Sequence, residues 1–520
     1  MASVASRRPA LAGVSARLRP VALPAALLVG VSVLSLGLRT LTLGKSFWMD
    51  EALTLGIASE PFGDIPGALR GDGSPPLYYA LLHVWASAFG DGMATTQALS
   101  LVFATLAIPA GLWAGWSLFG RRAGLITAAF AALNPFLTLY ANETRMYALM
   151  VLLSILATAT FVHAFVYRRR AYLPAFAVLL AAMLYTHNWG FFFGAGCTVA
   201  VLACVLLGDD HRALLRDALL GFGGTALLYA PWLPTLLYQS AHTAAPWLNP
   251  PRLGTPIQIG KDLLGGSGAS VALILAGGSG VAALFRRRPR TPERTAVIAL
   301  LLIPIGTLVV AWVFSHISPA WTTRYLGVIL GPLFLLGALG LARAGRLGIV
   351  ALCIVLAFWA IPRTFDPKNK SNAKDLARDV KRQLRPGDLV VVTQPEQTPL
   401  LRYQIGPGPT YASVLGRHPN PSVMDWRDGL ERMRASRPAT QLEPLLARVP
   451  RGGKVVLVRP APSKSDDWDA PWTRLVRRRS AQWFAALERD PRFRRTAIVP
   501  YAFRVSTRIG VHGAVYTRVS

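Results

Sequence analysis

The chain has 520 residues, 52% of them hydrophobic and 16% charged, with a mean hydropathy of +0.39. This composition excludes disordered, fibrous and disulfide-scaffold proteins and indicates a membrane protein. The net charge of +29 would suit a nucleic-acid-binding protein, but the basic residues lie largely in short clusters between long apolar runs. Such clusters set the orientation of membrane spans, so nucleic acid is not an expected partner.

Eleven apolar runs are long enough to cross a bilayer as helices of about 20 residues. They cover residues 21–43, 93–118, 123–140, 145–167, 171–187, 189–207, 217–237, 268–285, 295–314, 325–342 and 347–362. With the N-terminus in the cytoplasm, eighteen Lys and Arg residues fall on the cytoplasmic side and eight on the other side, up to residue 363. This asymmetry predicts a multi-pass protein of the inner or plasma membrane, with a cytoplasmic tail (1–20) and a transmembrane module (21–362).

The composition changes after the last apolar run, and an odd number of spans places this part outside the cytoplasm. Strand-like runs lie at residues 389–393, 454–459, 497–505 and 511–519, and helical patterns at 373–384, 425–435 and 468–489. We therefore predict a small extracytoplasmic α/β domain over residues 363–520. Its basic charge suits an anionic membrane surface or a phosphorylated glycan, or serves only to keep the domain soluble.

The first outer loop, residues 44–92, is much longer than the usual connection of about 4 to 6 residues. It should therefore have its own structure and a function. Asp50 and Glu51 follow Trp48 directly, near the start of the loop. Further along, residues 72–79 read DGSPPLYY, and the double proline predicts the start of a helix just after Asp72. Asp72 could cap this helix, orient an acceptor or bind a divalent cation.

The later outer turns supply cations. A helix beginning near Glu143 would aim backbone N–H groups at the outer surface beside Arg145, which predicts an anion site. Arg324 lies in another outer turn. Both arginines could hold a phosphate in two-point fashion or extend to lipid headgroups. The remaining candidates either line the substrate or pack in the aromatic belt; they are Tyr78, Tyr147, His187 and His316.

Three motifs, taken in order, resemble those of the polytopic GT-C glycosyltransferases. They are residues 48–52 (WMDEA), residues 72–78 (DGSPPLY) with His83, and residues 140–149 (YANETRMYAL). The chain is most similar to glycosyltransferase family 39, with protein O-mannosyltransferases and lipid A aminoarabinose transferases as relatives. The resemblance covers roughly residues 20–360 and implies a polyprenyl-phosphate-linked sugar as donor, transfer outside the cytoplasm, and Asp50 as the first-loop acid. The family has His-Pro-Pro in the second motif, and this chain has Ser74 in place of the histidine. The role of that histidine is therefore not carried over.

The residues themselves suit this chemistry. Glycosyl transfer passes through an oxocarbenium-like state and needs a carboxylate to accept the proton of the attacking hydroxyl. We expect Asp50 to be this base, with Glu51 and Asp72 as further catalytic candidates, and Arg145 and Arg324 to bind the donor phosphate. The absence of a G-x-G-x-x-G loop before a helix agrees with a lipid-linked donor. No cofactor is expected with certainty, although Asp50 and Asp72 could hold Mg²⁺ or Mn²⁺.

The predicted protein is therefore an inverting membrane glycosyltransferase that moves a hexose or pentose to a cell-envelope glycan, a glycolipid or a protein. A transporter or lipid-linked sugar flippase is the main alternative. It predicts ionisable groups near the bilayer midplane, whereas the carboxylates of the first 365 residues all lie outside the middle of the apolar runs. A non-enzymatic anchor for the C-terminal domain and a phosphate-transferring enzyme are further alternatives.

Overall fold

The protein is a helical bundle followed by a domain built on a β-sheet. The computed structural model describes residues 11–207, 210–286, 291–360, 370–461, 469–499 and 510–520. The first ten residues of the predicted tail, the predicted boundary at 362–363, and residues 500–505 of the strand expected at 497–505 lie outside these ranges.

Over its described residues, each of the eleven predicted apolar runs coincides with one or more helices. The bundle consists of α1 (Leu11–Thr40), α5 (Met93–Phe119), α6 (Arg121–Leu133), α7 (Pro135–Tyr140), α8 (Tyr147–Phe161) with η2 (Val162–Val166), η3 (Arg170–Tyr172) with α9 (Leu173–Thr186), α10 (Trp189–Leu207), α11 (His211–Tyr229) with η4 (Ala230–Trp232) and α12 (Leu233–His242), η5 (Thr255–Gln258), α13 (Ile259–Leu263), α14 (Ser267–Ala272) with η6 (Leu273–Gly277) and α15 (Gly278–Phe285), α16 (Pro292–Ile317), η7 (Thr323–Ile329) with α17 (Leu330–Arg343), and α18 (Gly345–Ala360). Among the described residues, seven helices or joined helices are long and apolar enough to cross a membrane. The protein is thus a multi-pass membrane protein.

Small residues let the helices of the bundle approach closely, as is typical of membrane helix pairs. A Cβ atom on Gly196 of α10 would lie 2.3 Å from the carbonyl oxygen of Ile303 in α16. A Cβ atom on Gly124 of α6 would lie 2.8 Å from the carbonyl oxygen of Leu112 in α5. Arg39 of α1 is also buried in the bundle, where its guanidinium donates to backbone carbonyls of α5 and α6.

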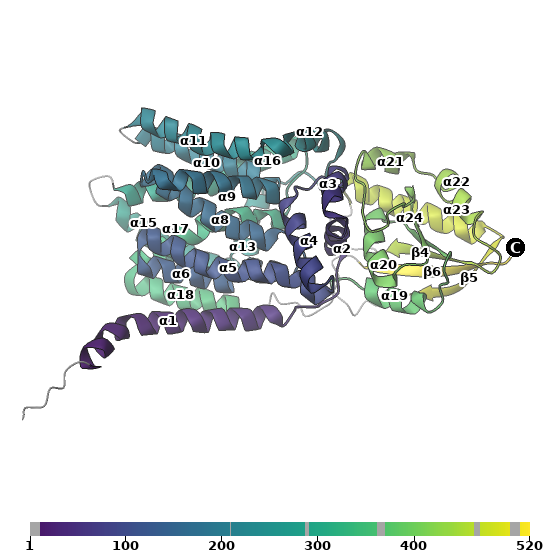
Figure 1. Cartoon of the computed structure of the whole chain (residues 1–520), viewed down its shortest axis with the longest axis horizontal. Helices are drawn as coiled ribbons and strands as arrows, with labels where there is room; N and C mark the ends of the chain where they lie inside the picture. The colour runs from purple at the N-terminus through teal and green to yellow at the C-terminus, as the bar shows by residue number, and fades with distance from the viewer. Residues whose placement is uncertain (1–10, 208–209, 287–290, 361–369, 462–468, 500–509) are drawn as a thin grey trace, which may run out of the picture.

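The first loop forms a layer between the bundle and the C-terminal domain (Figure 1). It contains α2 (Met49–Ala58), η1 (Phe62–Asp64), α3 (Ile65–Asp72) and α4 (Leu77–Phe89). The double proline does precede α4, as predicted, because proline is tolerated where a helix begins and its N–H would have no partner. The bundle helices run side by side along the long axis of the molecule, and the C-terminal domain lies beyond one end of them (Figure 1).

Within its described residues, the C-terminal domain has a six-stranded sheet in the order β3-β2-β1-β4-β6-β5. Its strands are β1 (Leu389–Val392), β2 (Thr410–Ser413), β3 (Gly416–Arg417), β4 (Lys454–Pro460), β5 (Phe493–Val499) and β6 (Val511–Arg518), and its helices are α19 (Ala373–Lys381), η9 (Pro395–Gln397), α20 (Thr398–Ile405), α21 (Gly429–Ala435), α22 (Pro438–Gln441), α23 (Glu443–Leu446) and α24 (Pro471–Arg489). Strand β1 is parallel to β2 and β4, and the other pairs are antiparallel. The predicted α/β class is confirmed, although β2, β3 and α20 were not predicted, and β5 begins four residues before the predicted strand.

Helix α2 belongs to the hydrophobic core of the C-terminal domain as well as to the first loop. Leu53 packs with the residues on one face of the sheet, including Val391 and Leu457. Ala52 and Leu55 pack with the residues on the opposite face. Because α2 contributes to both cores, it caps the end of the sheet that faces the bundle. The loop with the predicted catalytic acid is therefore held from two sides.

Candidate active site

Asp50 and Arg324 form the centre of the candidate site. Asp50 is the second residue of α2, where a carboxylate is favoured by the partial positive charge of a helix N-terminus. Arg324 Nη1 donates to Asp50 Oδ2 at 2.6 Å, and the two side chains are only 18% and 15% exposed, respectively. The guanidinium of Arg324 also lies over the ring of Trp48, 5.2 Å from its centroid. The first-loop acid and one of the two predicted phosphate-binding arginines are thus in direct contact.

Arg145 lies beside this pair. Its Nη1 donates to Thr54 Oγ1 at 2.6 Å and, at 3.4 Å, to the backbone oxygen of Asp50. The backbone of Arg145 is held in turn, because Ser100 Oγ donates to its carbonyl oxygen at 3.0 Å and lies 2.9 Å from the hydroxyl of the buried Tyr78. Two guanidinium groups and one carboxylate therefore meet at the end of the bundle that carries the C-terminal domain.

Glu51 has a different environment from its neighbour Asp50. It is fully buried, and its Oε1 accepts from the backbone N–H of Thr144 at 2.9 Å and from Gln97 Nε2 at 3.0 Å. Its Oε2 accepts from Lys370 Nζ at 2.9 Å. Burial raises the pKa of Glu51, and the nearby Glu143 adds to this effect, whereas Lys370 opposes it. These contacts hold the first loop in place. We therefore propose that Glu51 positions the neighbouring Asp50 and does not itself touch the substrate.

The turn before α8 differs from the predicted one. A helix was expected to begin near Glu143, but α8 begins at Tyr147 and residues 141–146 form turns. The physical reason lies in the contacts of this segment. The N–H of Thr144 bonds to Glu51, and the carbonyl oxygen of Asn142 accepts from Lys370 Nζ at 2.6 Å. Because the N–H of Thr144 already bonds to Glu51 and no helix begins here, the predicted row of free N–H groups at Glu143 is wrong.

Asp72 ends α3, and Gly73 follows it in the left-handed conformation with φ of 95°. Burial raises the pKa of the Asp72 carboxyl group, and the charge of Asp50 adds to this effect. Hydrogen bonds from Ser74 and the charge of Arg145 oppose it. Asp72 therefore lies within electrostatic reach of both charged groups, and its bonds to Ser74 hold the turn that leads to α4. Its part in the reaction stays a prediction.

His187 joins the cluster through its ring, but His316 does not. The ring of His187 lies 4.4 Å from that of Tyr325 and 6.3 Å from that of Tyr147. Burial lowers the pKa of His187 to about 3, and the charges of Arg145 and Arg324 add to this effect, so the imidazole is neutral at physiological pH. His316, in contrast, is exposed and packs against Trp312 of its own helix. The substrate-lining role predicted for these residues is untested.

Lys370 and Gln97 belong to the site but were not predicted. Gln97 is a buried amide in the apolar run 93–118, and a polar residue in such a run is a signal that sequence reasoning could have used. Lys370 gave no signal, because a single lysine in a basic linker is unremarkable in composition. Within the described residues, no three His, Cys, Asp or Glu side chains form a group that could hold a metal ion. Binding of Mg²⁺ or Mn²⁺ by Asp50 and Asp72 stays a prediction, and Arg324 already bonds to Asp50.

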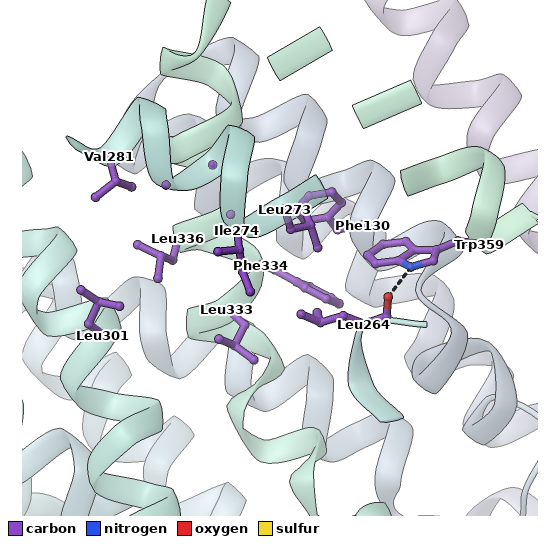
Figure 2. Close-up of a pocket in the computed structure, with 13 residues that line it drawn as sticks. Phe130, Leu264, Leu273, Ile274, Val281, Leu301, Leu333, Phe334, Leu336 and Trp359 are labelled. Atoms are coloured by element: carbon purple, nitrogen blue, oxygen red, sulfur yellow. Dashed lines mark hydrogen bonds between the residues drawn. The ribbon is translucent and has the colours of Figure 1, made fainter. Parts of the chain in front are cut away.

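A separate, apolar cavity of about 270 Å³ lies within the bundle (Figure 2). Its lining comes from α6, η6, α15, α16, α17 and α18, together with Leu264, and consists of Phe130, Leu264, Leu273, Ile274, Gly277, Gly278, Val281, Leu301, Leu333, Phe334, Leu336, Gly337 and Trp359. The indole N–H of Trp359 is bonded to the carbonyl oxygen of Leu264 at 2.8 Å, which leaves a hydrocarbon surface suited to an apolar chain (Figure 2).

The bundle, the first-loop layer and the C-terminal sheet domain together define a multi-pass membrane protein with the GT-C fold. No protein-family model matches the sequence, and no curated protein does. Solved structures, in contrast, are similar to this chain in fold. ArnT from Cupriavidus metallidurans in the apo state has a TM-score of 0.61 at 14% identity, covering 96% of this chain and 98% of that chain.

Two further solved structures have the same fold. ArnT from the same organism bound to undecaprenyl phosphate has a TM-score of 0.56 at 15% identity, covering 95% of this chain and 98% of that chain. The oligosaccharyltransferase of Archaeoglobus fulgidus in complex with Zn and sulfate has a TM-score of 0.54 at 15% identity, covering 83% of this chain and 67% of that chain. These structures confirm the GT-C resemblance of the sequence motifs at the level of the fold.

Proposed function

We propose that the protein is an integral membrane glycosyltransferase of inverting type, which moves one monosaccharide from a polyprenyl-phosphate carrier to an acceptor outside the cytoplasm. The observation that carries this proposal is the contact of Asp50 with Arg324, with Arg145 beside it, between the bundle and the C-terminal domain. One carboxylate and two fixed guanidinium groups are the parts that transfer from a lipid phosphate needs.

In the proposed reaction, Asp50 accepts the proton of an acceptor hydroxyl while the hydroxyl oxygen attacks the anomeric carbon of the donor sugar. The bond between this carbon and the phosphate oxygen breaks, and the lipid phosphate leaves with the electron pair. Arg145 and Arg324 stabilise the charge that develops on the departing phosphate. Attack from the face opposite the leaving group inverts the anomeric configuration. Since phosphate is already a good leaving group, no general acid is required.

The ion pair suggests how Asp50 is prepared. Before the donor binds, Arg324 orients the Asp50 carboxylate and Arg145 holds the backbone of the same residue. A donor phosphate would compete with Asp50 for Arg324, because a guanidinium group can bond to two anions through its fork of donors. Donor binding would therefore loosen one contact of the base at the moment when the acceptor arrives.

The lipid part of the donor is supported by two observations. The apolar cavity of about 270 Å³ can take part of a hydrocarbon chain. One of the solved structures with this fold is a complex with undecaprenyl phosphate.

The distribution of Lys and Arg supports a reaction on the side opposite the cytoplasm. The acceptor is a cell-envelope glycan, a glycolipid or a protein.

The proposal is tested by transfer from radiolabelled polyprenyl-phosphate mannose, arabinose, galactose or glucose to membrane acceptors. We expect Asp50→Asn to lower the transfer rate by about 10² to 10⁴, the usual contribution of a general base. Arg145→Ala should also lower it. Asp64→Asn is the matched control, because Asp64 is an exposed acid of the same loop. Native rates in Asp50→Asn would refute the proposal. Translocation of the labelled donor without transfer would instead support a flippase.

A further inference from the structure

Arginines gather on one surface of the C-terminal domain, where α21 and α22 pack against α24. Arg474, Arg478 and Arg479 belong to α24. Arg434 lies in the last turn of α21, and Arg437 directly precedes α22. Of these residues, Arg434, Arg437, Arg474 and Arg478 are exposed, and we call these four the arginine patch.

Arg479 fixes the arrangement of the arginine patch and is itself only 3% exposed. Its Nε donates to the carbonyl oxygen of Met433 at 3.1 Å, and its Nη2 donates to that of Arg434 at 2.8 Å. These bonds tie α24 to the last turn of α21, where the helix carbonyls need partners. Arg437 Nη1 donates to the same Arg434 oxygen at 2.7 Å. The segments that carry the patch are therefore joined by hydrogen bonds, and the patch is a fixed feature of the fold.

No carboxylate is paired with the arginine patch within the described residues. Helix α24 has no acid between Pro471 and Leu487, and none of the four patch residues forms an ion pair in the described part of the chain. Burial lowers the pKa of Arg479, and the charges of Arg437 and Arg478 add to this effect, so these cations lie close enough to repel one another. Solubility does not require such a cluster, because charges of both signs spread over a surface serve that purpose. The patch therefore indicates a partner that supplies anions.

The helices that carry the arginine patch lie beyond the first-loop layer, on the side away from the bundle (Figure 1). The N–H of Trp472, at the start of α24, donates to the carbonyl oxygen of Pro246 in the loop after α12 at 3.0 Å. Its indole Nε1 donates to Glu396 Oε1 at 3.0 Å, and Glu396 belongs to η9, which packs against α2. Trp472 is thus connected through η9 to the helix that carries Asp50, and the patch begins two residues further on, at Arg474.

The partner of the arginine patch should carry several anionic groups. A guanidinium group binds phosphate or carboxylate through two parallel N–H donors. Arg474 and Arg478 are four residues apart and so share one face of α24, and the other two patch residues come from the neighbouring segment of α21 and α22. Four such groups on adjoining segments suit a chain with several anions better than a single ion.

The position of the arginine patch restricts the class of this partner. A lipid headgroup is disfavoured, because the first-loop layer lies between the patch helices and the membrane-spanning bundle (Figure 1). Nucleic acid is disfavoured, because the distribution of Lys and Arg predicts that the C-terminal domain lies outside the cytoplasm. A glycan with phosphate or carboxylate groups along its chain satisfies both restrictions.

We propose that the arginine patch is a docking surface for a glycan that carries several phosphate or carboxylate groups, and that this glycan is the acceptor. The inference rests on the proposed glycosyltransferase function and narrows the acceptor to an anionic glycan or a molecule that carries one. Docking holds the acceptor beside the first-loop layer and so raises its effective concentration near Asp50. The patch contributes no group to the reaction itself. It should therefore lower the KM for an anionic acceptor and leave kcat unchanged.

The first test measures glycan binding to the full-length protein in phosphatidylcholine nanodiscs by fluorescence anisotropy. The labelled probes are a phosphorylated mannan and polygalacturonate, and the control is the same mannan after enzymatic removal of its phosphate groups. We expect at least one anionic probe to bind about tenfold or more tightly than the neutral mannan, and salt to weaken this binding, because salt screens exposed charges. Equal binding of all three glycans, or binding that does not respond to salt, would overturn the inference.

A triple variant assigns the binding to the arginine patch. Arg434→Gln, Arg474→Gln and Arg478→Gln remove three exposed charges whose side chains make no hydrogen bond within the described residues. The unfolding temperature should not fall, because charges of one sign are being removed from one another's neighbourhood. Binding of the anionic probe should weaken about tenfold or more, because each guanidinium group lost is a charge-assisted contact. Native affinity in this variant would overturn the inference.

A matched control removes the same number of charges from another place on the domain. Lys374→Gln, Lys381→Gln and Arg382→Gln change exposed residues in or next to α19. The buried residues of α19 and of α24 pack on opposite faces of the sheet. We expect the control variant to bind the anionic probe like the native protein. Equal weakening in the two triple variants would show that net charge alone is responsible and would overturn the inference.

Competition distinguishes the glycan from other anionic partners. Vesicles of phosphatidylglycerol represent a lipid surface, and poly-glutamate represents an acidic protein. Displacement of the probe by either of them at lower anion concentration than by the anionic glycan would assign the patch to that partner and overturn the inference.

Transfer kinetics separate this inference from the proposed function. With an anionic acceptor, the patch variant should show a raised KM and the native kcat, and with the same acceptor stripped of its anionic groups it should behave like the native protein. Asp50→Asn should lose transfer while binding of the anionic glycan persists, because Asp50 is not part of the patch. Native transfer in Asp50→Asn would refute the glycosyltransferase mechanism, whereas a native KM in the patch variant would refute only the docking surface.

Discussion

Lys370 Nζ lies 2.9 Å from Glu51 Oε2, although 319 residues separate the two in the sequence. Lys370 is the first described residue after the bundle, and its ammonium group also bonds to the carbonyl oxygen of Asn142. The pair therefore joins the start of the C-terminal domain to the first loop and to the turn before α8. Because Glu51 directly follows Asp50, this contact fixes the helix that carries the proposed base.

Loss of the Lys370 cation should destabilise the protein. In Lys370→Met, Glu51 keeps its burial and loses its cation, and breaking a buried pair in this way typically costs about 3 to 5 kcal/mol. The pKa of Glu51, already raised by burial, rises further. A raised pKa in the folded state means that stability is retained at low pH and lost as the pH rises through that value. Thermal unfolding should therefore show a larger defect at about pH 8 than at about pH 5.

Two comparisons make this measurement specific. Lys374→Met removes an exposed lysine of the same domain and should leave the unfolding temperature and its pH dependence unchanged. The double variant Glu51→Gln with Lys370→Met should recover part of the lost stability, because no buried charge is then left without a partner. A defect of equal size at both pH values would contradict the assignment of the effect to Glu51.

At Gly56, α2 packs closely against the backbone of the C-terminal domain. A Cβ atom at this position would lie 1.8 Å from the carbonyl oxygen of Ser422, so Gly56→Ala forces the two backbones apart. We expect a loss of stability of about 1 to 3 kcal/mol, as for other overpacked contacts, and a marked loss of transfer activity. Gly67→Ala is the control, since a Cβ atom there meets nothing within 4 Å and alanine favours the helix. Similar melting temperatures for the two variants would show that the contact is not restrictive.

The apolar runs and the chain order of the motifs could be predicted from the sequence because both depend on local information. A membrane span is read from about 20 neighbouring residues, and the start of α4 from Pro75 and Pro76. Asp50, Arg145 and Arg324 could be named because each lies in an outer loop or turn, and because the resemblance to the GT-C motifs implied Asp50 as the first-loop acid. Their meeting within hydrogen-bonding distance was a hypothesis that only the packing of the bundle could test.

The contacts that were missed are non-local. The bond between Lys370 and Glu51 depends on the packing of the whole bundle, and no sequence pattern near residue 370 predicts this bond. The two-sided burial of α2 follows from its place at the end of the sheet, where Leu53 packs on one face and Leu55 on the other, and it was not predicted. Helix α8 begins at Tyr147 and not near Glu143 as predicted, because the side chains of Glu51 and Lys370 bond to the backbone before it.

His187 makes stability depend on pH. Its pKa is lowered from 6.5 to about 3, so the unfolded chain binds a proton that the folded protein does not. Stability is complete above about pH 6.5 and should fall by about 1.4 kcal/mol per pH unit below it. In His187→Asn, whose amide oxygen can still accept the N–H of Trp189, the slope should become smaller by about this amount, and the part due to the lowered pKa of His418 should remain. His316→Asn, at an exposed histidine, should keep the full slope. Parallel unfolding curves for native protein and His187→Asn between about pH 6 and pH 4 would contradict the buried, neutral imidazole.

The apolar cavity should accept part of the lipid tail of the donor, and a side chain that fills it should compete with that tail. Gly278 lines the cavity, has helical backbone angles, and offers open space to a Cβ atom, so Gly278→Leu places its side chain there without strain. A tail displaced from the cavity stays in the hydrocarbon of the bilayer, so it loses only its packing contacts with the lining. At about 0.1 to 0.2 kcal/mol per atom pair, loss of roughly five contacts raises the KM for the donor about twofold to fivefold. The kcat should change little, because the cavity lining contains none of the proposed catalytic residues.

Gly223→Leu is the control. It adds the same side chain at an exposed helical glycine of α11 with open space around it, and should leave the donor KM unchanged. Equal KM values for the two variants would place the lipid tail elsewhere on the bundle.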